Sequence, residues 1–319
     1  KNASSRAVLS NAAVGVDLRT DATSTAYPVG SILSSVAVGS GAVAQFGTAI
    51  GADAQAGKNN GAGSYSSGTA IGAAANATGS NSIAISSSHT NPAVATGSGS
   101  IAMGTAAWAT NTSSVAIGSV ATSKADRATA IGRYAEASGY SSLALSSEAK
   151  ARGENAVAIG TLAVADISDS IAIGSSATTS GSTAKGVAIG YNAKSVEGAI
   201  AIGESAHAES VLVGGVAQIS VAVGMKSIAK GQDAAAFGTR ARAESDFGTA
   251  IGNYANTTER NATAVGNSAS ASGMGSSAFG NFSNATGSNA TAIGGGGLPG
   301  TFQGAQALAD GATAIGGND

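Results

Sequence analysis

The sequence predicts an all-β solenoid, a stack of short coils of 14 residues each. A phrase of any residue, Ala, a Val/Ile/Leu/Met/Phe residue and then Gly or Ser occurs 20 times between Gly15 and Gly316. Most copies are 14 residues apart, as in the run that ends at Gly224, Gly238, Gly252, Gly266, Gly280 and Gly294. A fixed period this short is typical of a solenoid, in which one repeat cannot bury its apolar face alone.

The composition agrees with a thin solenoid. Among 319 residues only 4% are aromatic and 11% are charged, whereas Gly numbers 47, so a compact globule would lack the bulky side chains to fill its centre. A hydrophobic content of 43% argues against disorder. The net charge of −2, without charge runs, predicts no nucleic-acid partner and no anionic membrane surface as partner. The absence of Cys excludes disulfides and thiolate metal sites.

The positions within one coil predict two short strands joined by a turn. We number each coil from the Gly or Ser that ends the phrase, which is position 0. Positions −3 and −1 are apolar or Thr, as in Ile171 and Ile173, and positions +3 and +5 are Ala, Ser or Thr on either side of a polar +4 residue such as Glu136. This alternation predicts one strand before the Gly and another after it. We expect positions −3 and −1 to point into the coil.

Position −2 is Ala in all 20 copies of the phrase. If positions −3 and −1 point inward, position −2 faces out of the coil, and stacked coils present an apolar ladder too large for a soluble monomer to expose. The ladder therefore predicts contact between copies of the chain, although it does not give their number. The interface candidates are Ala37, Ala102, Ala116, Ala130, Ala144, Ala158, Ala172, Ala188, Ala201, Ala222, Ala236, Ala250, Ala264, Ala278 and Ala292.

Five intervals between phrases exceed the period, and we expect loops in most of them. They contain Ala12–Ala37, Lys58–Ser67, Ser87–Ser100, Glu204–Ser220 and Gly295–Ala312. Within the fourth, residues 211–214 resemble a degenerate coil. The expected organisation is an N-terminal cap or degenerate first coils over 1–35, a β-roll over 36–316 with insertions near 52–67, 87–100, 204–220 and 295–312, and a truncated end at 317–319. Loops on a rigid scaffold are where binding residues concentrate.

Motifs such as residues 81–86, 155–160 and 169–174, each in a coil of this kind, closely resemble the head repeats of YadA-like trimeric autotransporter adhesins. The resemblance covers about residues 36–316. It implies a homotrimer of left-handed parallel β-rolls displayed at the bacterial cell surface, on the outer membrane. It further implies binding to extracellular-matrix proteins, host cells or other bacteria through the repeats themselves. No neck, heptad stalk or membrane anchor is recognisable, so we expect membrane attachment only through a missing C-terminal part.

Exposed aromatic and Arg side chains are the candidates for ligand binding, because such residues are enriched as interface anchors. They are Trp108, Arg133, Tyr134, Tyr191, Arg240, Arg242 and Tyr254. The same rings could instead cover neighbouring coils, and the Arg residues could simply be solvated. We expect no enzyme activity, cofactor or metal, because His89 and His207 are the only His residues and neither belongs to a recognisable catalytic or metal-binding pattern.

The leading functional hypothesis is the head of a bacterial surface adhesin. It would attach to host cells or to collagen-like, fibronectin-like or laminin-like matrix ligands, and would mediate bacterial autoaggregation, by multivalent contacts along a trimeric rod. One alternative is an ice-binding solenoid, because Thr recurs at position −3, although on the expected inner side; thermal hysteresis would distinguish it. A solenoid enzyme acting on polysaccharides is the other alternative, and it lacks a pair of converging acids.

Overall fold

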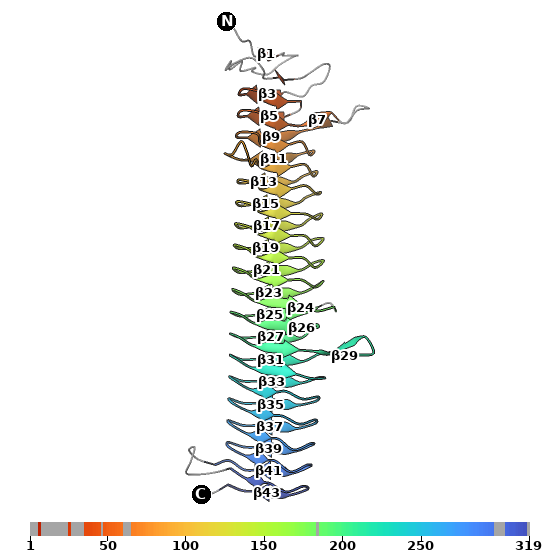
Figure 1. Ribbon diagram of the computed structural model, residues 1–319, viewed down its shortest axis with the longest axis vertical. Coiled ribbons are helices and arrows are strands. Elements are labelled where there is room, and N and C mark those ends of the chain that lie inside the picture. The colour runs from red at the N-terminus through yellow and green to blue at the C-terminus, as the bar shows by residue number, and fades with distance from the viewer. Residues whose placement is uncertain are drawn as a thin grey trace. The chain divides into compact units, whose positions relative to one another are not determined.

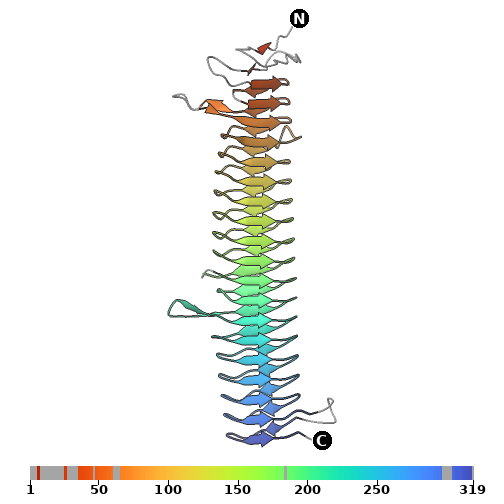
Figure 2. The same cartoon turned by 180° about the vertical axis from the view of Figure 1, so that it is seen from behind.

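The protein is all-β and forms two compact units, residues Lys1–Leu162 and Ala163–Asp319. The computed structural model describes residues 6–7, 25–26, 35–45, 47–59, 65–182, 185–296 and 304–317. Each unit is a parallel β-solenoid in which every regular coil contributes one strand to a first sheet and one to a second sheet (Figures 1 and 2). The solenoid predicted from the repeat is thus confirmed.

The first unit contains two parallel sheets and one hairpin. Its first sheet consists of β3 (Ser35–Val38), β5 (Gly47–Ile50), β9 (Gly68–Ile71), β11 (Ser82–Ile85), β13 (Ile101–Met103), β15 (Val115–Ile117), β17 (Thr129–Ile131), β19 (Leu143–Leu145) and β21 (Val157–Ile159). Its second sheet consists of β1 (Arg6–Ala7), β2 (Thr25–Ala26), β4 (Val43–Ala44), β6 (Gln55–Ala56), β10 (Asn76–Ala77), β12 (Val94–Ala95), β14 (Trp108–Ala109), β16 (Thr122–Ser123), β18 (Glu136–Ala137) and β20 (Lys150–Ala151). The hairpin pairs β7 (Lys58–Asn59) with β8 (Tyr65–Ser66).

The second unit repeats this plan. Its first sheet consists of β23 (Ile171–Ile173), β25 (Val187–Ile189), β27 (Ile200–Ile202), β31 (Val221–Val223), β33 (Ala235–Phe237), β35 (Thr249–Ile251), β37 (Thr263–Val265), β39 (Ser277–Phe279), β41 (Thr291–Ile293) and β43 (Thr313–Ile315). Its second sheet consists of β22 (Val164–Ala165), β24 (Thr178–Ser180), β26 (Lys194–Val196), β28 (His207–Glu209), β32 (Ile228–Lys230), β34 (Arg242–Ala243), β36 (Asn256–Thr257), β38 (Ser270–Ala271), β40 (Asn284–Ala285) and β42 (Gln306–Ala307).

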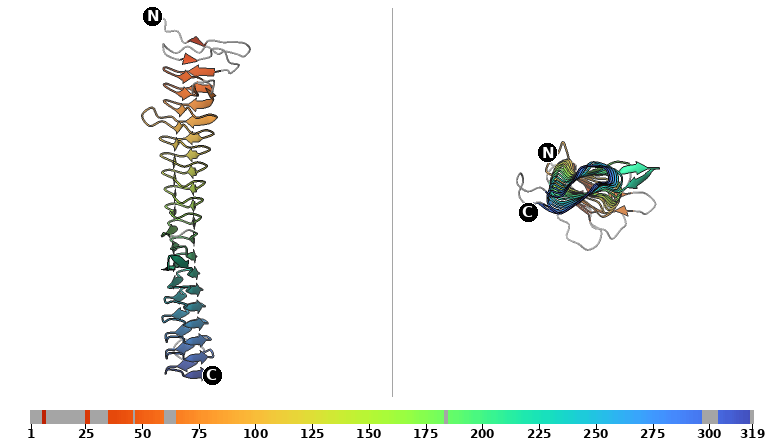
Figure 3. Two further views of the ribbon diagram at one scale, coloured as in Figure 1. Left: turned by 90° about the vertical axis from the view of Figure 1, so that its right-hand side faces the viewer. Right: turned by 90° about the horizontal axis from the view of Figure 1, so that it is seen from below.

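Equivalent positions of neighbouring coils stand beside one another in both sheets. In the first sheet Ala116, Ala130 and Ala144 are successive register partners, and in the second sheet Trp108 is the partner of Thr122. Figure 3 shows the strands stacked one coil above the next within each unit. A side chain type that recurs at one coil position therefore becomes a continuous column on the surface or in the core.

The core lies inside the coil and is made of small side chains. The alanines at position −2 from Ala49 to Ala292 have no exposed area in the single chain, and they lie on the same side as the buried alanines of positions +3 and +5, such as Ala135 and Ala137. Position −4 on the same side holds residues such as Ser142. The largest fully buried side chains among the described residues are Thr179 and Thr257, so the two sheets pack across a thin layer of methyl and hydroxyl groups.

The expected orientation of the first strand was therefore wrong. The turn at position 0 is short, as shown by the hydrogen bond from the Ala135 N–H to the Gly132 carbonyl at 3.2 Å, and it leaves no room for Val or Ile between the sheets. The apolar −3 and −1 side chains point out of the coil instead. The interface candidates that are buried inside their own coils are Ala102, Ala116, Ala130, Ala144, Ala158, Ala172, Ala188, Ala201, Ala222, Ala236, Ala250, Ala264, Ala278 and Ala292, and only Ala37 is partly exposed.

The Gly found at position 0 of most coils is favoured by both its backbone conformation and its neighbour in the next coil, and Ser146 occupies the same position with φ +120°. Gly252 has φ +135°, a conformation that residues with a Cβ rarely adopt, and a Cβ placed there would lie 2.3 Å from the Gly266 carbonyl oxygen. The far turn of the coil is closed by an equivalent backbone hydrogen bond, from the Ser114 N–H to the Asn111 carbonyl at 3.3 Å, to which a side chain adds a second one. The Ser114 hydroxyl donates to the Asn111 carbonyl at 2.7 Å, which explains why Ser is frequent at position −4.

Residues 211–214 do not form a degenerate coil. They belong to an antiparallel hairpin of β29 (Val211–Val213) and β30 (Val216–Gln218), which leaves the solenoid after β28 and returns to it at β31. The hairpin is seen beside β27 and β31 in Figure 1. The parallel neighbours β27 and β31 still pair directly, so the insertion does not interrupt the stack.

Candidate functional surface

Each unit carries an apolar face on the outer side of its first sheet. We define the apolar face as the two columns of side chains at positions −3 and −1. In the first unit these columns include Val115, Ile117 and Leu143, all partly exposed, and Ile71 is 38% exposed. Soluble monomers usually expose contiguous apolar surfaces of no more than roughly a few hundred Å², so a continuous pair of aliphatic columns is typical of a surface that another molecule covers. This face, and not the alanines of position −2, is therefore the apolar surface that the coils expose.

The threonines at position −3 lie on the same outer face, not on the inner side as expected. Thr249 and Thr263 are register partners in β35 and β37, and both are partly exposed. The −1 column beside them is apolar, with Ile251 42% exposed and Val265 partly so. The face is therefore mixed, with a hydroxyl-bearing stretch next to an aliphatic column.

The outer side of the second sheet carries mostly polar side chains, in contrast to the apolar face. Glu136 Oε1 lies 3.0 Å from Lys124 Nζ, and Glu136 Oε2 lies 3.8 Å from Arg152. In the second unit, Arg242 lies 2.6 Å from Glu244. Exposed ion pairs of this kind contribute at most about 1 kcal/mol each, so they mark a solvent-facing surface rather than a source of stability.

His207 is the described titratable group whose environment changes its pKa most clearly. Its side chain is 25% exposed, and its Nε2 lies 3.5 Å from Glu209 Oε2. Burial lowers the pKa of His207 below the ordinary value of 6.5, the charges of Lys230 and Lys194 lower it further, and Glu209 opposes the shift. Because the folded protein binds this proton less well than the unfolded chain, the stabilising contribution is complete above pH 6.5 and is lost as the pH falls through the lowered pKa.

We therefore expect the His207→Gln variant to lose less stability on acidification than the wild-type protein. Urea-unfolding midpoints measured between about pH 7.5 and about pH 5, a range that brackets the ordinary His pKa, give the comparison. The matched control is His89→Gln, because the His89 side chain is 60% exposed. Identical pH dependence in the wild-type protein and the His207→Gln variant would contradict the expectation.

The sequence-predicted ligand-binding residues do not form a single site. Trp108, 53% exposed, lies on the outer side of the second sheet in the first unit. Arg133 and Tyr134 lie in the turn that follows β17 in the same unit. In the second unit, the turn after β25 carries Tyr191, 62% exposed. These side chains are spread over different coils and two different surfaces.

Two of the predicted Arg residues stack on predicted aromatic rings. The Arg133 guanidinium lies 4.9 Å from the centre of the Tyr134 ring, and the Arg240 guanidinium lies 5.1 Å from that of Tyr254. Arg240 also donates a hydrogen bond to the Tyr254 hydroxyl in the next coil. Arg242 is not part of this pair, because it lies on the second sheet and pairs with Glu244.

The sequence reasoning missed two further Arg–aromatic pairs at the far turn. Arg127 lies 5.6 Å from the centre of the Tyr140 ring, and Arg260 lies 5.3 Å from that of Phe247. The members of each pair are separated by about one coil length in the sequence. A search for Arg and aromatic residues at that spacing would have found both pairs.

The described residues contain no group of three or more His, Cys, Asp or Glu side chains that could hold a metal ion. In the same part of the chain, no helix is long and apolar enough to cross a membrane.

Comparison with known proteins identifies the repeat. A comparison with curated proteins finds no match. A family model described as the YadA head domain repeat matches residues 66–85, 95–121, 123–145, 147–163, 151–177, 168–193, 229–255, 258–283, 271–296 and 303–318. Because these matches cover more than half of the chain, the protein belongs to the YadA head-domain family of trimeric autotransporter surface adhesins.

Proposed function

We propose that this protein is the head of a bacterial adhesin that binds host cells or extracellular-matrix proteins as a homotrimer on the cell surface. The proposal rests on the difference between the two outer surfaces of each coil, which lie on opposite sides. The first sheet presents aliphatic columns, and the second sheet presents polar side chains and ion pairs. Around a threefold axis the apolar faces of three copies cover one another, and the second sheets point toward ligands.

The apolar columns suit an interface between identical chains. Val115, Thr129 and Leu143 form part of one column, and Ile117, Ile131 and Leu145 form part of the other. Around a symmetry axis, equivalent coils of the copies lie at the same level. Because every coil carries similar side chains at positions −3 and −1, the columns of the copies can pack against one another along their whole length. Burial of aliphatic area provides about 25 cal/mol per Å², so a contact repeated along many coils gives a permanent assembly.

The ligand classes that we propose are collagen-like, fibronectin-like and laminin-like matrix proteins, together with the same head on neighbouring bacteria. The Arg–aromatic pairs recur on separate coils, so weak contacts are multiplied in each copy and again by the trimer. Linked weak contacts raise avidity by large factors without a deep site.

Single substitutions at the exposed rings are expected to weaken adhesion only modestly. For Tyr134→Ala or Tyr254→Ala, we expect the apparent affinity for a collagen-coated surface to fall less than about tenfold, because the remaining contacts maintain avidity. Surface plasmon resonance on immobilised collagen, fibronectin and laminin measures the effect. Complete loss of binding from either change would contradict a distributed surface.

A further inference from the structure

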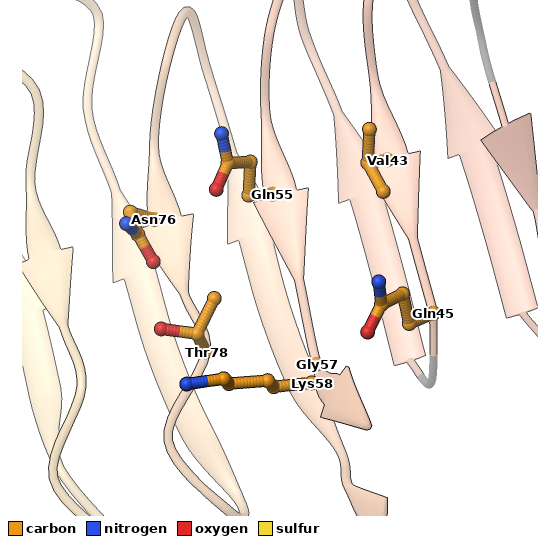
Figure 4. A pocket seen from close by; sticks show the side chains of 7 residues that line it. All are labelled: Val43, Gln45, Gln55, Gly57, Lys58, Asn76 and Thr78. Carbon is orange, nitrogen blue, oxygen red and sulfur yellow. The ribbon is translucent and has the colours of Figure 1, made fainter. Parts of the chain in front are cut away.

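A hollow of about 440 Å³ lies on the outer side of the second sheet in the first unit. Its floor is formed by three neighbouring coils. Position +4 contributes Val43, Gln55 and Asn76, which are register partners in β4, β6 and β10. Position +6 contributes Gln45, Gly57 and Thr78, and Lys58 of β7 forms one side. Figure 4 shows the amide side chains on the adjacent strands and the Lys58 side chain extending alongside Thr78.

The hollow exists because of a local departure from the repeat. Gly57 occupies position +6, where the flanking coils carry Gln45 and Thr78. No side chain therefore fills the middle of the lining at this position. Gly57 has φ +70°, and its N–H donates to the Ala77 carbonyl at 2.9 Å, which holds the backbone in the sheet as the chain leaves for the β7–β8 hairpin. The insertion thus creates the depression and places Lys58 beside it.

The lining is suited to a ligand rich in hydroxyl groups that also carries a negative charge. Amide side chains offer both donors and acceptors, and the Thr78 hydroxyl offers both as well. Among the described residues that line the hollow, Lys58 is the only charged one, so an anionic ligand would contact a cation and no carboxylate there. Asn76 Oδ1 is buried without a hydrogen-bond partner, whereas buried polar atoms are usually paired.

An aromatic ring lies on the same surface at a suitable distance. Asn76 of β10 is the register partner of Val94, and Val94 is the partner of Trp108 in β14. Neighbouring strands are about 4.8 Å apart, so the Trp108 backbone lies about 10 Å from the hollow along the sheet, a distance that a short oligosaccharide covers. Trp108 is 53% exposed, and the apolar face of a pyranose ring packs well on an indole.

We propose that this surface binds a carboxylated oligosaccharide, with its carboxylate at Lys58, its hydroxyl groups on Gln55 and Asn76, and a sugar ring on Trp108. The assignment rests on the proposed adhesive function and names a ligand class for one part of the outer surface. In the proposed trimer the hollow stays accessible, because it lies on the second sheet, opposite the apolar face. Uronic acids and sialic acids share the required chemistry.

Intrinsic fluorescence provides the test, since Trp108 is the only Trp in the chain. The full chain is titrated with a hyaluronan tetrasaccharide, which carries uronic acids, with 3′-sialyllactose, and with neutral lactose. Saturable changes of the Trp108 emission are expected for at least one carboxylated sugar, and which sugar binds distinguishes the two sources. Lactose is expected to bind at least about tenfold more weakly, because a charge-assisted contact is lost.

Variants separate the hollow from general charge effects. Lys58→Gln is expected to weaken binding of the carboxylated sugar about tenfold. The matched control is Lys150→Gln, at position +4 of another coil in the same unit and outside the hollow, and it should leave binding unchanged. Calorimetric titration of Trp108→Ala should also show weaker binding. The proposal is overturned if no carboxylated sugar binds, or if Lys58→Gln binds as well as the wild-type protein. Binding to matrix proteins in that case would leave the adhesive function standing.

Discussion

Replacing Ala236 with Leu is expected to lower the free energy of unfolding by about 1–3 kcal/mol or more, because a packed core does not accept the added carbons. Ala236 at position −2 has no exposed area, and its register partners are Ala222 and Ala250. The same change at Ala235, position −3 of the same strand, is expected to cost less than the change at Ala236, because position −3 lies outside the coil interior. Leu143 already occupies the equivalent position of another coil.

Urea unfolding followed by circular dichroism compares the two Ala→Leu variants directly. They differ by one position in one strand, so helical or strand propensity and added volume are the same in both. A larger loss for Ala235→Leu than for Ala236→Leu would mean that the apolar −3 and −1 side chains, and not the alanines, fill the coil. Equal small losses would mean that the coil interior is not tightly packed.

Placing charge on the apolar face is expected to separate the copies. In the double variant Ile117→Asp with Ile131→Asp, two neighbouring coils of each chain carry a carboxylate where the proposed trimer brings three copies together. Burying these carboxylates in the interface costs free energy, because they are removed from water and repel one another. No cation at positions −3 and −1 of the coils that the structure describes compensates for the loss. We expect the double variant to sediment with the mass of one chain and to keep its β-rich circular dichroism spectrum.

The control places the same charge on the opposite surface. The double variant Thr110→Asp with Thr122→Asp adds two carboxylates on the outer side of the second sheet in the same unit. Thr110 is exposed and Thr122 is partly exposed. This variant should retain the mass of the wild-type assembly. If both double variants dissociate, the effect is general charge repulsion, and the apolar face is not the interface.

Much of the fold could be predicted from the repeat itself. The recurrence of Gly at position 0 fixed the coil length, and the alternation around it correctly indicated the strands Thr129–Ile131 and Glu136–Ala137. Alternation shows that position −2 lies opposite positions −3 and −1, but it does not show which side is inside. Position −4 carries that information, because residues such as Ser142 share the side of position −2 and match the small residues at +3 and +5.

The candidate site was less predictable than the fold. Exposure of Trp108, Tyr134 and Tyr254 followed from their positions in the coil, and the structure confirms that exposure. The contact between Arg240 and Tyr254 arises from stacking of neighbouring coils, so it becomes visible only once the coils are aligned. The hollow at Gly57 has the same origin, since an absent side chain matters only beside the Gln45 and Thr78 that flank it.

The apolar face is the centre of the functional proposal, and sedimentation equilibrium of the wild-type chain tests it most directly. A single species with the mass of three chains, independent of concentration over the micromolar range, is the result we expect. It would support the apolar faces as a permanent threefold contact and the second sheets as the ligand-facing surface. A soluble monomer with the same circular dichroism spectrum would contradict the proposal, because the aliphatic columns would then be stable in contact with water.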